Sequence, residues 1–242
     1  LPCHFNQHTD AGRIIIRARK ELPGLPIDPE VIIMGTEHHR LAAELGVRPG
    51  DHSHNICHGH LPEVRDILPP GLNVGSADRL KAEPISAVYA TTMQRTQQTV
   101  APLAAFLERE ISIEGDLREI ALGEWEGGLL RQKAAENHPI YQEMVRQQRW
   151  DVIPGAESNE TFSDRCLRAL DRIVRRHPGE LVLCGVHGGV IGAVLARIAN
   201  SRPFAFGGSD NCSISQIVFA DGEWIIRRFN DSSHLYQHLH HG

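Results

Sequence analysis

Hydrophobic positions in the second half of the chain follow two patterns that alternate. Short runs rich in β-branched residues, such as ISAVYA (85–90) and LVLCGV (181–186), are typical of buried strands. Longer stretches with an apolar residue every three or four positions, such as MQRTQQTVAPLAAFLERE (93–110) and GVIGAVLARIA (189–199), predict helices. Because strands that alternate with helices form a largely parallel sheet covered on both faces, the pattern indicates an α/β protein.

The rest of the second half supplies elements of both kinds. A short strand is expected at ISIEGDL (111–117), followed by a polar helical stretch at 129–150 that a proline interrupts. Segment 157–179 predicts a helix with a Ser or Asn cap at its start and a His-Pro-Gly stop at its end. The stretches SISQIVFA (213–220) and EWIIRRFN (223–230), joined by Asp-Gly, predict a hairpin.

The first part of the chain is less regular. Strands are expected at 13–21 and 30–35, a short helix at 38–46, and a helix at 73–83 that leads into the next strand. No internal repeat and no low-complexity linker divides the chain, so we expect a single domain over residues 1–242.

Composition and charge argue against several classes of protein. The formal net charge of −5 argues against a nucleic-acid-binding protein, which needs a basic face. No apolar run approaches the ~18 residues that cross a bilayer, and the N-terminus has neither an apolar signal core nor an initiating Met. Five scattered cysteines without CxxC spacing do not form a disulfide framework, and Cys184 lies in an apolar run. We therefore expect a processed or truncated, soluble, cytoplasmic protein without a nucleic-acid or membrane partner, and a disordered tail at 236–242.

Three polar side chains follow predicted strands, where open α/β sheets bind ligands. Arg95 offers a planar fork of donors that suits a phosphate or carboxylate, although it could also be a solvated helix residue. Glu119 precedes a Gly-aromatic-Gly loop and is a candidate proton donor, provided that burial or a neighbouring anion raises its pKa. The alternative for Glu119 is an ion pair with Arg118 or Arg95.

His187 stands between a predicted strand and a Gly-Gly helix start. At such a turn a histidine can face an anion together with backbone N–H groups, although it could also be a hydrogen-bonded turn residue. An Arg, a Glu and a His at three strand ends of one α/β domain together indicate a phosphoryl pocket.

Five segments resemble consecutive motifs of the histidine phosphatase superfamily, in its phosphoglycerate mutase-like branch (branch 1). They are ISAVYATTMQRTQQT, LREIALGEWEG, PGAES (154–158), LVLCGVHGGVI and NCSI (211–214), in the family's order, and they cover roughly residues 84–235. The resemblance implies a three-layer α/β/α fold of the phosphoglycerate mutase type with a mostly parallel central sheet. Residues 128–158 are expected to form a cap segment over the site.

The resemblance also implies a reaction without a metal or another cofactor. A histidine attacks the phosphoryl group of a small-molecule phosphomonoester, a glutamate protonates the leaving oxygen, and water then releases phosphate from the phosphohistidine. Carried over by motif, Arg95, Gly188 and His187 bind phosphate, Glu119 is the acid and base, and His187 is the second histidine. Hydrolysis is favoured over mutase-type phosphotransfer because no segment clearly builds a closed, water-excluding pocket. Neither the substrate nor an oligomeric state, such as a homodimer, is specified.

The chain departs from the family at the nucleophile. The family places this residue in an Arg-His-Gly-Glu type motif after the first strand, and no such string occurs here. In VIIMGTEHHR the Arg-His pair is missing between Met34 and Gly35, which makes His38 the first candidate, with His39 and His58 behind it. A nucleophile absent from the chain is the fourth alternative.

Two rival functions stay open. A metal-dependent hydrolase is suggested by seven potential ligands within 23 residues, although their spacing matches no metal signature. These ligands are His38, His39, His52, His54, Cys57, His58 and His60. A non-catalytic member of the same fold, which binds phosphorylated ligands or a protein, is suggested by the missing nucleophile motif.

Overall fold

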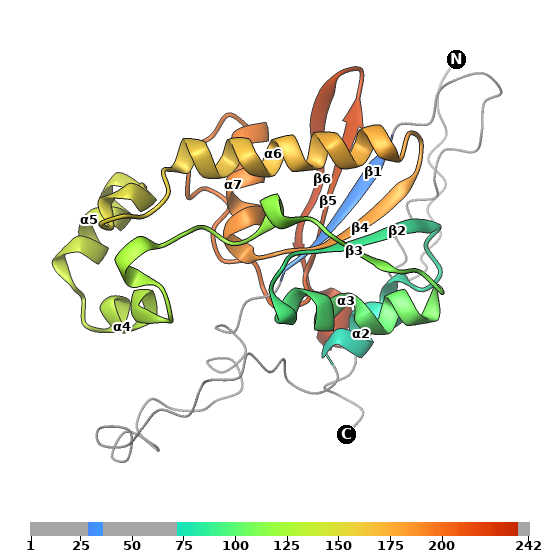
Figure 1. Ribbon diagram of the computed structural model, residues 1–242, viewed down its shortest axis with the longest axis horizontal. Coiled ribbons are helices and arrows are strands. Elements are labelled where there is room, and N and C mark those ends of the chain that lie inside the picture. The colour runs from blue at the N-terminus through green and yellow to red at the C-terminus, as the bar shows by residue number, and fades with distance from the viewer. Residues whose placement is uncertain (1–28, 36–71, 237–242) are drawn as a thin grey trace, which may run out of the picture.

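The computed structural model describes residues 29–35 and 72–236, which share one six-stranded sheet with helices on both faces (Figure 1). The strands are β1 (Glu30–Met34), β2 (Ile85–Ala90), β3 (Ile111–Ile113), β4 (Leu181–Gly185), β5 (Ile214–Ala220) and β6 (Glu223–Asp231). Each lies at a stretch where the hydrophobic pattern predicts a strand, but the stretch 111–117 is a strand only at its start, and Gly115–Leu117 form a 3₁₀ turn, η1. The strand expected at 13–21 and the helix expected at 38–46 lie outside the described residues.

The strands run in the order β3-β2-β4-β1-β5-β6. The first four are parallel to one another, whereas β5 is antiparallel to both β1 and β6. Asp221 and Gly222 join β5 to β6 with φ angles of 53° and 84°, the left-handed conformation of a type I′ hairpin turn. Met34 and Ala90 both pair with Gly185, so β1, β2 and β4 end at the same edge of the sheet. The mostly parallel α/β sheet is confirmed, with an antiparallel hairpin at one side.

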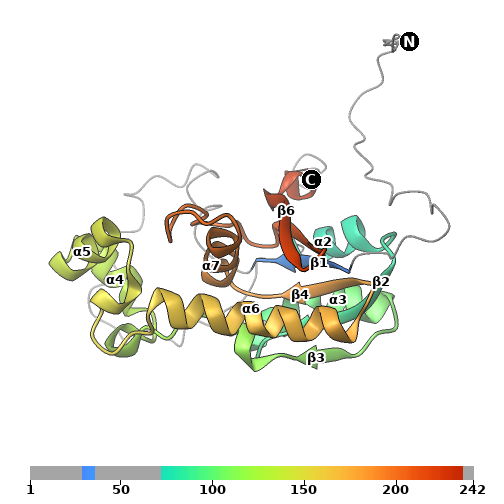
Figure 2. The same ribbon diagram turned by 90° about the horizontal axis from the view of Figure 1, so that it is seen from above.

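Helices cover both faces of the sheet (Figures 1 and 2). The helices α6 (Asn159–Arg176) and α7 (Gly188–Ile198) pack on one face, and α2 (Leu72–Leu80) and α3 (Gln94–Phe106) pack on the other. Alternate residues of β1 enter the two cores, so Val31 and Ile33 contact one cluster while Ile32 and Met34 contact the other. Burial on both faces explains why these strands are continuous apolar runs without alternation.

The ends of the helices follow local chemistry. Ser158 caps α6, because its Oγ accepts a hydrogen bond from Thr161 N at 3.1 Å, as predicted. Helix α3 continues through Pro102 but ends at Phe106, four residues before the predicted end. The reason is Glu108, whose φ of 54° cannot continue a right-handed helix.

The predicted helical stretch at 129–150 is divided at its proline. It forms α4 (Leu129–Ala135), α5 (Pro139–Gln147) and a 3₁₀ turn, η3 (Trp150–Val152). Pro139 is the first residue of α5, where its missing N–H is tolerated. Both helices lie together at one end of the molecule, beyond the sheet (Figures 1 and 2).

The described residues end with α8 (Ser233–Tyr236). The disordered tail predicted at 236–242 is therefore wrong at Tyr236, which is the last residue of this helix. Among the described helices, none combines the length and the apolar character that a membrane span requires. Cys166, Cys184 and Cys212 are buried and form no disulfide with one another, while Cys3 and Cys57 lie outside the described residues.

Candidate active site

His187 occupies the turn between β4 and α7, as the strand–His–Gly–Gly pattern predicts. It is fully buried, and its backbone is extended, with φ −115° and ψ 156°. The preceding residue, Val186, donates a hydrogen bond from its N to Met34 O at 3.0 Å, which ties the turn to the end of β1. The His187 side chain therefore lies at the edge of the sheet where the parallel strands end.

Both ring nitrogens of His187 have partners. Arg95 Nη2 lies 3.1 Å from Nδ1, and Thr91 Oγ1 lies 3.0 Å from Nε2. Since a guanidinium nitrogen can only donate, Nδ1 is the acceptor and the ring proton is on Nε2. Burial, reinforced by the charges of Arg95 and Arg165, lowers the pKa of His187 to about 3. The imidazole is therefore neutral near neutral pH.

Two buried threonines hold the segment that carries Arg95. Thr91 Oγ1 accepts a hydrogen bond from Met93 N at 3.2 Å and lies 3.0 Å from Thr96 Oγ1. Thr96 Oγ1 in turn accepts from Thr91 N at 3.1 Å and donates to Met93 O at 2.8 Å. These bonds fix the turn between β2 and α3 and so bring Arg95 to His187. Sequence reasoning gave Thr91 no role, because a threonine after a strand carries no distinctive signal.

Glu119 lies over the N-terminus of α7. Its Oε1 accepts from Ile120 N at 2.9 Å, and its Oε2 accepts from Gly189 N at 3.3 Å. A Cβ at Gly189 would collide with Glu119 Oε1 and would lie 2.9 Å from its Cδ, so the close approach requires glycine at that position. Burial raises the pKa of the Glu119 carboxyl, and the two N–H groups, Arg95 and Arg165 offset part of that rise. A raised pKa suits a proton donor near neutral pH.

A buried ion pair holds the segment that carries Glu119. The Nε and Nη2 atoms of Arg165 each lie 2.8 Å from a carboxylate oxygen of Glu157, and both side chains are less than one-tenth exposed. The same guanidinium donates to three main-chain oxygens, those of Asp116 at 2.7 Å, Arg118 at 2.8 Å and Glu119 at 3.0 Å. Arg165 was missed in the sequence because α6 carries many charged residues, and Glu157 was noted only as part of the PGAES motif.

The structure thus brings together Arg95, Glu119, His187 and Gly188. Arg95 Nη2 lies 3.1 Å from His187 Nδ1, Glu119 Oε2 accepts from Gly189 N, and Gly188 begins α7 directly after His187. The candidate nucleophiles His38, His39 and His58 lie outside the described residues, and so does the whole histidine-rich group considered as a metal site.

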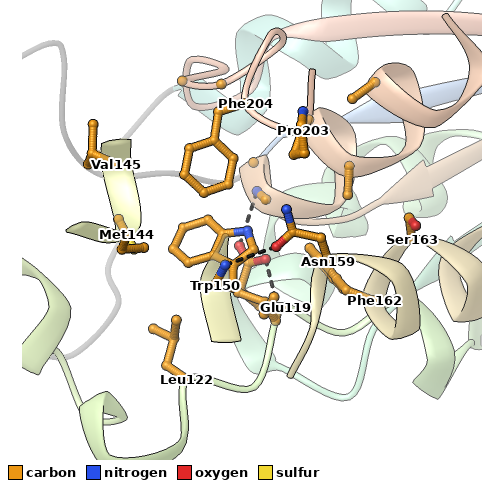
Figure 3. Close-up of a pocket in the computed structure, with 18 of the residues that line it drawn as sticks. Glu119, Leu122, Met144, Val145, Trp150, Asn159, Phe162, Ser163, Pro203 and Phe204 are labelled. Carbon is orange, nitrogen blue, oxygen red and sulfur yellow. Dashed lines mark hydrogen bonds between the residues drawn. The ribbon is translucent and has the colours of Figure 1, made fainter. Parts of the chain in front are cut away.

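A cavity of about 850 Å³ extends from this site (Figure 3). Glu119, Gly188 and Gly189 belong to its lining. Other lining residues come from the cap segment, residues 128–158, and from the segment that follows α7, residues 200–208. The predicted cap segment therefore lines the cavity that leads to Glu119.

Two proteins of Arabidopsis thaliana are similar to much of this chain. The metal-independent phosphoserine phosphatase is 32% identical over 166 residues, which are 67% of this chain and 68% of that protein. Phosphoglycerate mutase-like protein 4 is 37% identical over 166 residues, which are 66% of this chain and 70% of that protein.

Solved structures share the fold at lower sequence identity. Bacillus stearothermophilus YhfR has a TM-score of 0.65 and 21% identity, and the match covers 86% of this chain and 99% of that one. A phosphoserine phosphatase mutant from Entamoeba histolytica, in complex with phosphoserine, has a TM-score of 0.66 and 16% identity, with the same coverage.

The family model of the histidine phosphatase superfamily (branch 1) matches residues 75–232, which is most of the chain. The resemblance drawn from the five sequence motifs and the expectation of a phosphatase-type enzyme are confirmed. The chain belongs to branch 1 of the histidine phosphatase superfamily.

Proposed function

We propose that the protein hydrolyses small-molecule phosphomonoesters through a phosphohistidine, without a metal. The observation that carries the proposal is the meeting of Arg95, Glu119 and His187 at the N-terminus of α7. Arg95, His187 and the N–H of Gly188 bind the phosphoryl oxygens, where the positive end of a helix favours an anion. Glu119 protonates the leaving oxygen.

A bound phosphoryl group changes the charges at this site. A dianion is a stronger acceptor for Arg95 than the neutral Nδ1 of His187, so the guanidinium turns toward the phosphate. The anion then raises the pKa of His187 and favours an imidazolium that donates to a phosphoryl oxygen. The same anion raises the pKa of Glu119 further and keeps its proton available for the leaving group.

The nucleophile is proposed to be His38, with His39 and His58 as the alternatives. Gly35, the last described residue after β1, is held by hydrogen bonds to Ser213 O at 3.1 Å and from Cys212 N at 2.7 Å. The chain leaves β1 there, next to Val186. His38 is three residues farther along, so its backbone can lie at most about 11 Å from that point.

The proposed reaction has two steps. In the first, an imidazole nitrogen of the nucleophile forms a bond to phosphorus while the ester oxygen leaves with the proton of Glu119. In the second, Glu119 takes a proton from water, the water oxygen attacks phosphorus, and the P–N bond breaks. Inorganic phosphate and the free histidine are the products.

Residues 128–158 are proposed to be the cap of a single domain, because several of them line the cavity. A reducing cytoplasmic setting is proposed from the buried, unpaired Cys166, Cys184 and Cys212. A homodimer stays a prediction. Mutase-type phosphotransfer is the alternative reaction of the same phosphohistidine.

Rapid acid quench with a ³²P-labelled phosphomonoester tests the proposal. We expect an acid-labile, base-stable phosphoenzyme, and loss of the label in His38→Ala but not in His39→Ala or His58→Ala. Loss in one of the other two variants would reassign the nucleophile. Absence of both label and turnover would indicate a binding protein, and activity abolished by a chelator would indicate a metal-dependent hydrolase.

A further inference from the structure

We propose that the cavity beside Glu119 holds the alcohol part of the substrate, and that this alcohol is bulky and apolar, such as an arylalkyl or medium-chain alkyl group. The inference rests on the proposed function and adds the substrate class to it. Small acids such as phosphoserine would leave most of the cavity unfilled. Three properties of the cavity carry the inference, namely its position, its lining and its rigidity.

The position of the cavity follows from the proton donor. Glu119 protonates the ester oxygen, so the carbon chain attached to that oxygen must begin beside the Glu119 carboxyl. The cavity reaches the same place, because Glu119 and its contact Gly189 both belong to its lining. The leaving group therefore enters the cavity while the phosphoryl group stays at the N-terminus of α7.

The lining of the cavity is mostly apolar. Its apolar side chains come from both sides, and several of them are labelled in Figure 3. They are Ile120, Leu122, Leu130, Ala134, Tyr141, Met144, Val145, Trp150, Phe162, Ala193, Ala196, Pro203 and Phe204. A volume of about 850 Å³ is in the range of sites that enclose ligands much larger than phosphoserine, for which ~300–1,000 Å³ is typical.

The charges of the described lining residues balance one another. With Glu119 protonated, as a proton donor must be, the charge of Glu160 opposes that of Arg131, while Arg197 Nε lies 3.7 Å from Asp164 Oδ1. A site for a small phosphorylated acid would need a net positive charge to bind the additional carboxylate. The lining is instead suited to a neutral, apolar group.

Two aromatic rings, which we call the aromatic wall, are held in place. The rings of Trp150 and Phe204 lie next to each other (Figure 3), with centroids 5.0 Å apart and an interplanar angle of 48°. Asn159 accepts from Trp150 N at 2.9 Å and donates to Gln148 O at 2.7 Å. Gln148 Oε1 in turn accepts from Phe204 N at 3.4 Å. The wall is therefore preorganised, which reduces the free energy lost when an apolar group is bound.

The first experiment compares kcat/KM for 2-phenylethyl phosphate, ethyl phosphate and phosphoserine. All three leave through a primary oxygen, so a difference reports mainly how the rest of the alcohol is bound. We expect 2-phenylethyl phosphate to exceed the other two by about tenfold or more. If phosphoserine is hydrolysed as well as 2-phenylethyl phosphate, the inference is wrong and the proposed function stands.

Variants then test whether the cavity residues cause the preference for 2-phenylethyl phosphate. Phe204→Ala should lower the ratio of kcat/KM for 2-phenylethyl over ethyl phosphate by about tenfold, because one ring of the wall is lost. Ala193→Phe on α7 should lower the same ratio by filling the cavity. Phe106→Ala is the matched control, since Phe106 is 62% exposed on α3 and should leave the ratio unchanged. An unchanged ratio in both cavity variants contradicts the inference.

A binding measurement separates the two proposals. Calorimetry measures the affinity for 2-phenylethylphosphonate and for ethylphosphonate, which cannot be hydrolysed. The difference in affinity shows how well the cavity binds the phenyl group in the absence of turnover. Tighter binding of the phenyl compound together with no hydrolysis would overturn the proposed function but support the cavity inference. Equal binding of the two compounds would overturn the inference whatever the turnover.

Discussion

The proposed phosphoryl site and the cap segment are built in different ways. At the proposed phosphoryl site, here called the phosphoryl end, Thr91, Thr96 and His187 are fully buried, and the Arg165 guanidinium is hydrogen bonded on all sides to Glu157 and main-chain oxygens. In the cap segment, α4 contains no buried residue, and Met144 is the buried residue of α5. The phosphoryl end is part of the main core, whereas the cap segment rests on a small cluster around Trp125, Met144 and Ile153.

This difference indicates a division of roles. Groups that stabilise charge act best when they are fixed before the substrate arrives, which dense hydrogen bonding provides. A lightly packed cap can change its side chains at low cost in stability, because surface positions rarely contribute more than about 0.5 kcal/mol each. We therefore expect substitutions at the phosphoryl end to abolish the reaction, and substitutions in the cap to change its selectivity.

The largest effect is expected from Glu119→Gln. Loss of the proton donor should lower kcat for an alkyl phosphate by about 10²–10⁴-fold. With p-nitrophenyl phosphate, whose leaving group needs no proton, phosphoenzyme formation should be nearly unchanged, and the phosphoenzyme should accumulate because water is no longer activated. Acid quench and the phenolate burst measure both. If the variant forms the phosphoenzyme more slowly by the same factor from both substrates, Glu119 is not the acid that protonates the leaving oxygen.

A second test compares two arginines of α6 that both form ion pairs. Arg165→Met leaves Glu157 buried without its partner and should lower the free energy of unfolding by about 3–5 kcal/mol. Arg172→Met removes pairs to Glu114 and Asp116 from a side chain that is 41% exposed, and should cost about 0–1 kcal/mol. Urea unfolding followed by circular dichroism measures both. Equal losses would show that Arg165 has no special role.

Adding a single methyl group at Gly189 tests whether the position of the Glu119 carboxyl matters for the reaction. In Gly189→Ala the new Cβ displaces the Glu119 carboxyl, so kcat for alkyl phosphates should fall by about 10²-fold, the effect of a misplacement near 1 Å. Gly115→Ala is the control, because its Cβ would meet only Thr92 Cγ2, at 4.0 Å. Steady-state kinetics on both variants decides the matter. Full activity in Gly189→Ala would mean that Glu119 need not lie on α7.

The smallest expected effect is the change in the free energy of unfolding for each unit of pH. His187 has an ordinary pKa of 6.5 when unfolded and a pKa of about 3 when folded, so the unfolded chain binds an extra proton between these values. Stability should therefore fall as the pH falls from 6.5 toward 3, by about 1.4 kcal/mol for each pH unit from this group alone. His187→Gln should show a shallower slope in unfolding experiments. Identical slopes would mean that His187 is not held neutral.

Much of the fold and the location of three candidate site residues could be predicted from the sequence, because their signals are local. Apolar runs mark β2 and β4, and Arg95, Glu119 and His187 each follow an element end in a recognisable motif. The supporting contacts could not be predicted, because they join residues far apart in the chain. Arg165 contacts the Asp116 carbonyl across 49 positions, and Gln148 contacts Phe204 across 56. The candidate nucleophiles His38, His39 and His58 fall outside the described residues and stay predictions.

The central claim is that Arg95, Glu119 and His187 surround one phosphoryl group. A crystal structure of the protein with orthovanadate tests it most directly. We predict vanadium at the N-terminus of α7, with its oxygens within hydrogen-bonding distance of Arg95, His187 and Glu119 and an imidazole bonded on the opposite side. Vanadate bound away from these three side chains, with the site itself empty at saturating concentration, would contradict the account.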